Sequence, residues 1–276
     1  MARRSNRLLF LGTGTSTGVP VIGCDCPVCL SEDPHDRRTR VCALLQTCGD
    51  DDENWVSVLL DTSIDLRQQL LDAGRPLVSV AVYTHAHVDH FFGLDELRAV
   101  QFKTKKPIEV FAQQPVLDRL KIVYSHLFDP NAQQGGGILS VNLHTAEDRF
   151  RAGPLELISL PVWHGDLPVL GYRWGSLAYM TDCNRIPDET WPLLEGIDIL
   201  VLDALRKRSH PTHFNIDQAL EAVSRIAPKR TYFVHMTHDL SHEATNAELP
   251  QGVELAYDGL CLDLEPFDPL SWTISE

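Results

Sequence analysis

The chain has 276 residues, of which 43% are hydrophobic and 22% are charged, a balance typical of a soluble globular protein with a substantial core. Its formal net charge of −14 gives no general attraction for nucleic acid or an anionic membrane, so we expect neither as a partner. No apolar run is long enough to span a bilayer, and the short run 8–11 breaks into glycines instead of forming a secretory signal. We therefore expect a cytoplasmic protein with a single domain over residues 1–276.

Short apolar runs with strand character alternate with helical patterns along the chain. The expected strands, in chain order, are 8–11, 56–60, 78–83, 108–111, 155–160, 177–180, 197–202 and 230–234. The expected helices are 64–73, ended by Gly74, then 115–127, and 215–227, which begins at the N-cap Asn215 and stops before Pro228. This mixture predicts a layered α/β fold, and the pattern alone leaves open whether it contains one sheet or two.

Surface loops are expected at the acidic stretch 49–54 and the glycine-rich stretch 133–137, since both are short and polar. Basic residues cluster tightly only at Arg206-Lys207-Arg208 and over 103–106. We expect both clusters to be solvated loops, with a local anion-binding patch as the alternative.

The densest group of metal-capable side chains follows the expected strand 78–83, as His85-x-His87-x-Asp89-His90. An extended backbone projects His85 and His87 to the same side, because they are two residues apart. Asp89 and His90 begin a helical segment over 91–100 and turn back towards the same point. Imidazole and carboxylate donors suit zinc, manganese or iron. An ordinary polar strand end, with its histidine hydrogen-bonded within the protein, would explain a single histidine here. It explains three histidines and an aspartate at this spacing less well.

Further candidate donors stand at the ends of other expected strands. They are His164 after 155–160, Asp182 after 177–180, and His235 after 230–234. Each of them alone is explained equally well as an ordinary polar strand terminus. Asp61 and Asp203 end two more strands and are candidates for carboxylates that orient a ligand histidine, with a cap or turn role nearly as well supported.

His-x-His-x-Asp-His after a strand resembles the signature of the metallo-β-lactamase superfamily. The resemblance implies an αββα sandwich of two mixed β-sheets flanked by helices, with the site at one edge. It also implies two divalent ions, Mn²⁺ or Zn²⁺, that can activate water and polarise phosphoryl oxygens. The implied ligands are His85, His87 and His164 for one ion, Asp89, His90 and His235 for the other, and Asp182 as a bridge.

Three of the seven cysteines crowd together as Cys24-x-Cys26-x-x-Cys29. In an intracellular chain such a cluster favours a metal over disulfides, with a redox pair or free thiols as the alternative. A tetrahedral zinc site needs a fourth ligand, and His238, three residues after His235, can supply it. The remaining cysteines lie singly in apolar or strand-like stretches and are expected to be inert core residues: Cys42, Cys48, Cys183 and Cys261.

Several segments together resemble the PhnP group of cyclic phosphodiesterases over about residues 8–262. They are Gly12-Thr-Gly14-Thr-Ser-Thr-Gly18-Val-Pro20, the three cysteines, Thr212-His213-Phe214 and His235-x-x-His238. The resemblance implies a structural zinc on the Cys₃His set, manganese in the dinuclear pair, and phosphoribosyl 1,2-cyclic phosphate, from phosphonate catabolism, as substrate. The glycines by themselves match neither a dinucleotide fingerprint nor a P-loop, so we expect them to form a tight bend after a strand.

The same resemblance implies that His213 is a catalytic residue that does not bind metal. Phosphodiester cleavage leaves an alkoxide that needs a proton, and a positioned histidine can supply it. His210 is the neighbouring rival for this role. Asp89 is expected to serve catalysis as well as metal binding.

Other functions stay open at this point. One is an RNA-processing endonuclease of the same superfamily, disfavoured by the net charge and by the absence of a long inserted arm. Another is a non-hydrolytic protein resembling pyrroloquinoline quinone biosynthesis protein B, which carries the cysteine cluster but an incomplete ligand set. A thioester, lactone or sulfate hydrolase is a third. We expect a small phosphorylated sugar or nucleotide as the substrate, and we leave a homodimer open.

Overall fold

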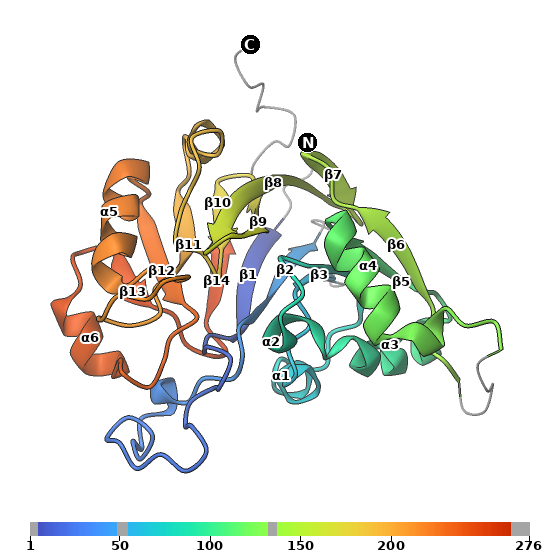
Figure 1. The fold of residues 1–276 in the computed structure, drawn as a ribbon, viewed down its shortest axis with the longest axis horizontal. Coiled ribbons are helices and arrows are strands. Elements are labelled where there is room, and N and C mark those ends of the chain that lie inside the picture. The colour runs from blue at the N-terminus through green and yellow to red at the C-terminus, as the bar shows by residue number, and fades with distance from the viewer. Residues whose placement is uncertain (1–4, 49–54, 132–136, 266–276) are drawn as a thin grey trace.

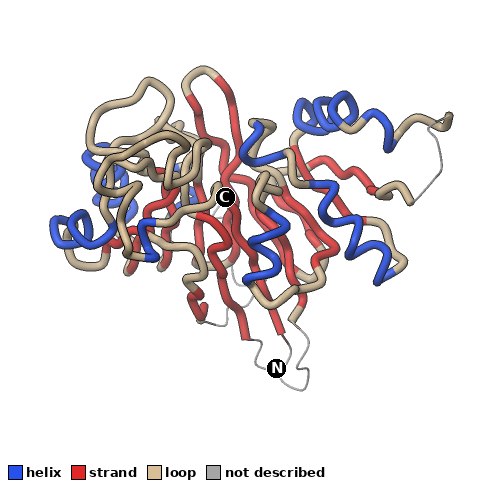
Figure 2. Tube along the Cα trace, turned by 90° about the horizontal axis from the view of Figure 1, so that it is seen from below, coloured by secondary structure: helices blue, strands red, loops and turns tan. Residues whose placement is uncertain are grey.

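Two seven-stranded β-sheets face each other in the computed structural model of this chain, and helices cover the outer side of each sheet (Figure 1). Seen from below, the strands fill the middle of the molecule and the helices lie to either side (Figure 2). The structure describes residues 5–48, 55–131 and 137–265. The acidic stretch 49–54 and most of the glycine-rich stretch 133–137 therefore lie outside the described residues, apart from Gly137.

Each sheet is mixed, with an antiparallel part and a parallel part. The first sheet, in spatial order, is β14 (Cys261–Leu264), β1 (Ser5–Gly12), β2 (Cys42–Cys48), β3 (Val56–Leu60), β4 (Val78–Val82), β5 (Ile108–Ala112) and β6 (Val141–Thr145). The second is β13 (Val253–Leu255), β12 (Arg230–Val234), β11 (Ile199–Asp203), β10 (Leu177–Met180), β9 (Leu167–Trp174), β8 (Leu155–His164) and β7 (Arg149–Ala152).

The helices fall into two sets that cover different sheets (Figure 1). Over the first sheet lie α1 (Leu66–Asp72), α2 (Val88–Phe91), α3 (Arg98–Thr104) and α4 (Gln114–Val123). Beside the second sheet lie α5 (Ile216–Ile226) and α6 (His242–Glu248). Short 3₁₀ turns are found at Pro34–Asp36, Leu94–Leu97, Ser125–Leu127 and Trp191–Leu194.

Buried apolar side chains form three layers that match this architecture. The central layer lies between the sheets and includes Phe10, Val82 and Tyr172. Outer layers join each sheet to its helices, for example through Phe91 on α2 and through Ala219 on α5. Alternation along each strand sends successive side chains to opposite faces, so that both faces of the central strands are buried, whereas alternate side chains of the edge strands β7 and β14 are exposed. The predicted αββα sandwich of two mixed sheets is confirmed.

The predicted strands are all present, with small differences at their ends. The strand expected at 197–202 begins two residues later, at Ile199, and the strand expected at 155–160 continues to His164. The helix expected over 115–127 ends at Val123 and is followed by a 3₁₀ turn. No helix in the described residues is long and apolar enough to cross a bilayer.

Glycines allow the chain to bend closely past its neighbours after β1, as the spacing predicted. A Cβ on Gly12 would lie 2.1 Å from the carbonyl oxygen of Arg40, and one on Gly14 would lie 2.8 Å from that of Arg38. Gly18 has a φ of +64°, which favours glycine. This bend leads from β1 into the loop that carries the three clustered cysteines.

One cysteine prediction is wrong. Cys42, Cys48 and Cys183 are buried, but Cys261 is exposed, because it begins the edge strand β14 with its side chain directed to solvent.

Candidate metal centre and active site

The first group of donors comes from three strand ends. His85 and His87 follow β4, His164 is the last residue of β8, and Asp182 follows β10. One ligand atom from each of these side chains lies within 4.8 Å of the others. His87 is exposed and the other three are buried, so the group opens to solvent on the side of His87. The structure brings together the residues predicted to hold the first ion.

The second group lies directly beside the first. Asp89 and His90 are on α2, and His235 follows β12. Their ligand atoms and that of Asp182 also lie within 4.8 Å of one another, and all four residues are buried. His235 Nε2 is 3.4 Å from Asp89 Oδ2. These are the residues predicted to hold the second ion.

Asp182 lies between the two groups and turns one carboxylate oxygen towards each. Its Oδ2 is 3.6 Å from His85 Nε2 in the first group. Its Oδ1 is 3.1 Å from His90 Nε2 and 3.2 Å from His235 Nε2 in the second. A bridging ligand needs this division of its two oxygens. The geometry therefore fits the predicted bridge, and bridging itself stays a prediction.

The donor atoms have the chemistry that a divalent cation requires. Nε2 of His85 and Nε2 of His90 are buried without a hydrogen-bond partner, although both face carboxylates. An unsatisfied buried nitrogen is costly, and a cation would satisfy both of these atoms. The imidazole and carboxylate set suits zinc or manganese. The residues present fit a pair of divalent ions.

The charges in the cluster also favour the binding of cations. Burial opposes ionisation of Asp182, but His235 and His90 hold its pKa well below the usual range. Burial also opposes charge on His90, yet Asp182, Asp61 and Asp89 raise its pKa well above the usual value. Burial lowers the pKa of His85, which keeps that ring neutral and able to bind a metal. The carboxylates thus attract positive charge to the centre of the cluster.

Asp61, at the end of β3, orients two of the candidate ligands. Its Oδ2 accepts a hydrogen bond from His90 Nδ1 at 2.8 Å and another from the Thr84 hydroxyl at 2.8 Å. The Thr84 oxygen in turn lies 3.0 Å from His85 Nδ1. Fixing Nδ1 in this way directs Nε2 of both rings towards the cluster. The structure thus shows the hydrogen bond that the orienting role considered for Asp61 requires, and the role itself stays a prediction.

Sequence reasoning missed two groups that orient ligand rings. Thr84 links His85 to Asp61, and the Thr212 carbonyl oxygen lies 2.7 Å from His164 Nδ1. The position of Thr84, directly before the histidine motif and after a strand, was a usable signal. No signal in the sequence could have indicated the Thr212 carbonyl, because it is 48 residues from His164 along the chain.

Three residues of the site have left-handed backbone. Asp61, Asp182 and His235 have φ values of +63°, +49° and +61°. A positive φ is uncommon for residues other than glycine and persists where surrounding contacts hold it. In each case it occurs within two residues of a strand end, where the chain turns sharply and the side chain enters the cluster.

His213, the predicted acid, lies outside the two donor groups around Asp182, although one of its ring nitrogens lies within 4.8 Å of ligand atoms of Asp203 and His235. Its ring stacks on His235 with centroids 4.7 Å apart and lies 4.5 Å from the His164 ring. Nδ1 is 2.7 Å from Oδ2 of the buried Asp203, which leaves Nε2 free to serve a substrate. Asp203 therefore orients His213, whereas sequence reasoning left open a mere turn role. The rival His210 lies farther out, 5.1 Å from His213 between ring centroids.

The cysteine cluster closes around one nitrogen of His238. Its Nδ1 is 3.2 Å from the Cys24 sulfur and 3.4 Å from the sulfurs of Cys26 and Cys29. Donors at about 2.0–2.3 Å from a tetrahedral zinc ion are roughly 3.5 Å apart, so this spacing fits one ion. The Cys29 N–H lowers the pKa of the Cys26 thiol to about 7, which favours a thiolate ligand. The predicted Cys₃His set is assembled in space.

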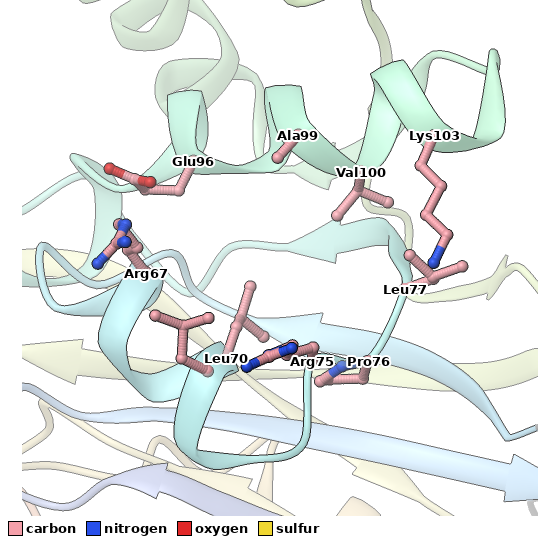
Figure 3. A pocket seen from close by; sticks show the side chains of 10 residues that line it. Arg67, Leu70, Arg75, Pro76, Leu77, Glu96, Ala99, Val100 and Lys103 are labelled. Atoms are coloured by element: carbon pink, nitrogen blue, oxygen red, sulfur yellow. The ribbon is translucent and has the colours of Figure 1, made fainter.

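A separate pocket of about 310 Å³ lies between α1 and α3, on the helical face of the first sheet (Figure 3). Leu70, Leu77 and Val100 form its apolar part, and Arg67 and Lys103 stand at its rim. It contains none of the clustered histidines and aspartates. The candidate active site is therefore the cluster at the strand ends, not this pocket.

Comparison with known proteins agrees with the fold. Residues 56–236 match the family model described as the beta-lactamase superfamily domain. A solved structure described as a new diphosphatase from the PhnP family is 41% identical, with a TM-score of 0.87, over 96% of this chain and 99% of that one. The chain belongs to the PhnP family of the beta-lactamase superfamily. This membership supports a metal-dependent hydrolase, and the fold implies divalent metal ions.

Two further relatives carry other names. An octanoyltransferase from Porphyromonas gingivalis is 36% identical over 92% of this chain, which spans about half (51%) of that protein. Zn²⁺-bound PqqB from Methylobacterium extorquens is 21% identical, with a TM-score of 0.72, over 94% of this chain and 100% of that one. At that identity the likeness to PqqB shows a shared fold alone.

Proposed function

We propose that this protein is a dinuclear metal-dependent phosphodiesterase that hydrolyses a small cyclic phosphodiester such as phosphoribosyl 1,2-cyclic phosphate, in phosphonate catabolism. The observation that carries this proposal is the position of His213. The ring is fixed by Asp203 through Nδ1 and lies against the ligand histidines of both groups. A hydrolase whose leaving group is an alkoxide needs such an acid beside its metal centre.

Two divalent ions, when bound, would supply polarisation of the phosphoryl group and activation of the attacking water. They would be held by His85, His87 and His164, by Asp89, His90 and His235, and by Asp182 between them. The Cys24, Cys26, Cys29 and His238 set would hold a third, structural zinc.

His213 gives a proton from Nε2 to the departing oxygen of the sugar. Asp203 accepts the Nδ1 hydrogen bond and so keeps the ring in the orientation and tautomer that this transfer needs. Nε2 has a proton to give only when the ring is cationic, and burial lowers the pKa of His213, which makes this cationic form a stronger acid but a smaller fraction at neutral pH. Asp89 would contribute negative charge at the second metal site, since His90 and His235 overcome the effect of burial and lower its pKa.

A second candidate is hydrolysis of a diphosphate, because the relative that is 41% identical is described as a diphosphatase. The same donors serve that reaction, but a phosphate leaving group depends less on an acid. The RNA-processing alternative is disfavoured by the net charge of −14. A complete donor set favours an enzyme over a non-hydrolytic PqqB-like protein. Octanoyl transfer is not proposed, because this chain matches only half of that relative.

Turnover of a substrate panel by the manganese- or zinc-loaded protein tests the proposal. The panel contains a ribose 1,2-cyclic phosphate, a 2′,3′-cyclic nucleotide, a linear dialkyl phosphodiester, a dinucleoside diphosphate, a precursor tRNA and p-nitrophenyl acetate. We expect the highest kcat/KM on a cyclic phosphodiester. Preference for the dinucleoside diphosphate establishes the second candidate, and preference for RNA or the carboxylic ester overturns both.

A further inference from the structure

The pocket between α1 and α3 is formed by two short helices and by the turn that leaves α1 (Figure 3). Leu70 on α1 and Val100 on α3 face each other across it. Gly74 and Arg75 follow α1 with left-handed φ values of +82° and +64°, and the Arg75 N–H donates to the Leu70 carbonyl at 2.8 Å. This tight turn brings Leu77, the residue before β4, into the wall of the pocket.

The inner surface of the pocket is aliphatic and partly open to solvent. Leu70 and Val100 are buried, whereas Leu71 and Leu77 are 37% and 46% exposed. Neighbouring apolar side chains that stay exposed mark interaction sites. The described residues that line the pocket include no aromatic ring. Its volume of about 310 Å³ lies at the lower end of the range for small-molecule sites, roughly 300–1,000 Å³. This space suits a short hydrocarbon chain.

Basic side chains surround this aliphatic surface. Arg67 on α1, Arg75 on the following turn and Lys103 on α3 line the pocket, and all three are exposed. None of them makes an ion pair within the part of the chain that the structure describes. Glu96 is the acidic residue of the lining, so three positive charges and one negative charge give the pocket a net charge of +2. The whole chain, by contrast, has a net charge of −14.

One of these cations belongs to a cluster that the sequence had already marked. Lys103 begins the basic stretch 103–106, for which a local anion-binding patch was the alternative to a solvated loop. A neighbouring cation on the same helix is compensated, because Arg98 lies 3.3 Å from Asp95. The pocket thus places positive charge that is not paired within the described residues next to space for hydrocarbon. Such a combination attracts a molecule with one anionic end and one apolar end.

We propose that this pocket binds a small anionic amphiphile, an aliphatic carboxylate of medium chain length. Its chain would displace water from the leucine and valine side chains, and its carboxylate would pair with the guanidinium of Arg67 or Arg75. Arg67 and Lys103 stand at opposite ends of the pocket, with Arg75 between them (Figure 3). Cations spread in this way suit one compact charge, whereas a phosphate dianion requires several donors that converge on one point.

Calorimetry on the metal-loaded protein tests the proposal with a series of carboxylates from butanoate to decanoate, each below the concentration at which it forms micelles. We expect one decanoate to bind per chain, with an affinity that falls about fourfold for each methylene group removed. Decyltrimethylammonium has the same alkyl chain with the opposite charge, and we expect it not to compete with decanoate. Affinity that does not depend on chain length, or equal competition by the cation, overturns the proposal.

Variants of the lining locate the bound carboxylate. Ala99 lines the pocket and is exposed, so Ala99→Phe fills the space without entering the core, and we expect it to abolish decanoate binding. We expect the double variant Arg67→Gln with Lys103→Gln to bind decanoate about 3- to 30-fold more weakly. The matched control, Arg119→Gln with Lys106→Gln, removes the same two charges outside the pocket and should bind as the wild type does. Binding that survives Ala99→Phe, or equal losses in both double variants, overturns the proposal.

Size-exclusion chromatography of the same proteins tests a second copy of the chain as the competing occupant. We expect the wild type and Ala99→Phe to elute at the same volume. A wild-type dimer that Ala99→Phe dissociates assigns the pocket to an interface between copies and overturns the carboxylate site. None of these measurements depends on turnover. A protein that binds decanoate but hydrolyses no phosphodiester therefore keeps the pocket and loses the proposed function, whereas failure of the pocket leaves the proposed function unchanged.

Discussion

We expect the His213→Ala variant to hydrolyse an alkyl cyclic phosphodiester about 100- to 10,000-fold more slowly than the wild type, with its metal content unchanged. His213 is absent from both groups of predicted metal donors. Its ring is held by Asp203 and stacks on His235, so that Nε2 is the group available to protonate a leaving oxygen. Losing that proton donor leaves the metal centre intact but makes departure of the alkoxide slow.

The dependence on the leaving group distinguishes an acid from a merely structural histidine. A p-nitrophenolate departs without a proton, so the variant should recover most of its activity on bis-p-nitrophenyl phosphate. His210→Ala is the comparison on the same loop, and we expect it to keep most of the wild-type kcat, because His210 lies beyond His213 and belongs to no donor group. Equal losses on both kinds of leaving group, or wild-type kcat on the alkyl substrate, would contradict the acid role of His213.

The second large effect is expected from Cys26→Ser. We expect this variant to lose the structural zinc, to melt at a lower temperature, and to bind the second catalytic ion about 10- to 100-fold more weakly. His235 and His238 are three residues apart on one segment. A cluster that no longer holds His238 therefore loosens the turn that directs His235 into the active site.

Hydrogen bonds around this segment explain why a substitution at Cys26 should affect the position of His235. The Met236 N–H donates to the Thr13 carbonyl at 3.1 Å, on the glycine bend that leads into the cysteine loop. The fully buried Arg38, at the far end of that loop, donates to the carbonyls of Thr237 and Leu240 at 2.8 and 2.6 Å. The cysteine loop and the end of β12 are thus joined on both sides of the predicted zinc.

Elemental analysis and thermal melting of the purified variants provide the measurement. Cys261→Ser is the matched control, because it makes the same substitution at an exposed thiol outside the cluster. We expect it to keep full metal content. If Cys26→Ser keeps both the full catalytic metal and the wild-type melting temperature, the two sites are independent and the coupling is wrong.

Much of the candidate site could be predicted because its donors follow strands that are clear in the sequence. The runs before Asp61, His85, Asp182 and His235 are short, apolar and bounded by polar residues, and in the structure each is a buried strand. Strand ends that meet at one edge bring distant residues together, so chain position was enough to mark these residues as candidate donors. The metal roles themselves came from resemblance to a family, not from periodicity.

Other parts of the fold had no strong local pattern. β9 contains Pro168 and Gly171, which break a strand signal, and it forms because β8 and β10 pair with its two edges. β2 is wholly buried although it contains Gln46 and Thr47. Their polar atoms bond to Ser57 and Asn6 on neighbouring strands, at 2.7 and 2.8 Å. These hydrogen bonds, which satisfy the buried polar side chains, depend on the pairing of distant strands. They cannot be predicted from the sequence of β2 alone.

The same limit applies to the details of the site. The sequence could not show that Asp182 turns one oxygen to each donor group, nor that Lys207 pairs with Glu248 and Arg208 with Asp239. These features depend on side chains from segments far apart in the chain. The division of the Asp182 oxygens also supports the most specific metal prediction, the bridging carboxylate.

Anomalous scattering from crystals of the metal-loaded protein, recorded at the manganese and zinc absorption edges, tests the central claim most directly. We predict two peaks about 3.5–4 Å apart on either side of the Asp182 carboxylate, one beside His164 and one beside His235. A single peak away from Asp182, or none in the histidine cluster of a protein that turns over phosphodiesters, would contradict a dinuclear centre at this edge of the sandwich.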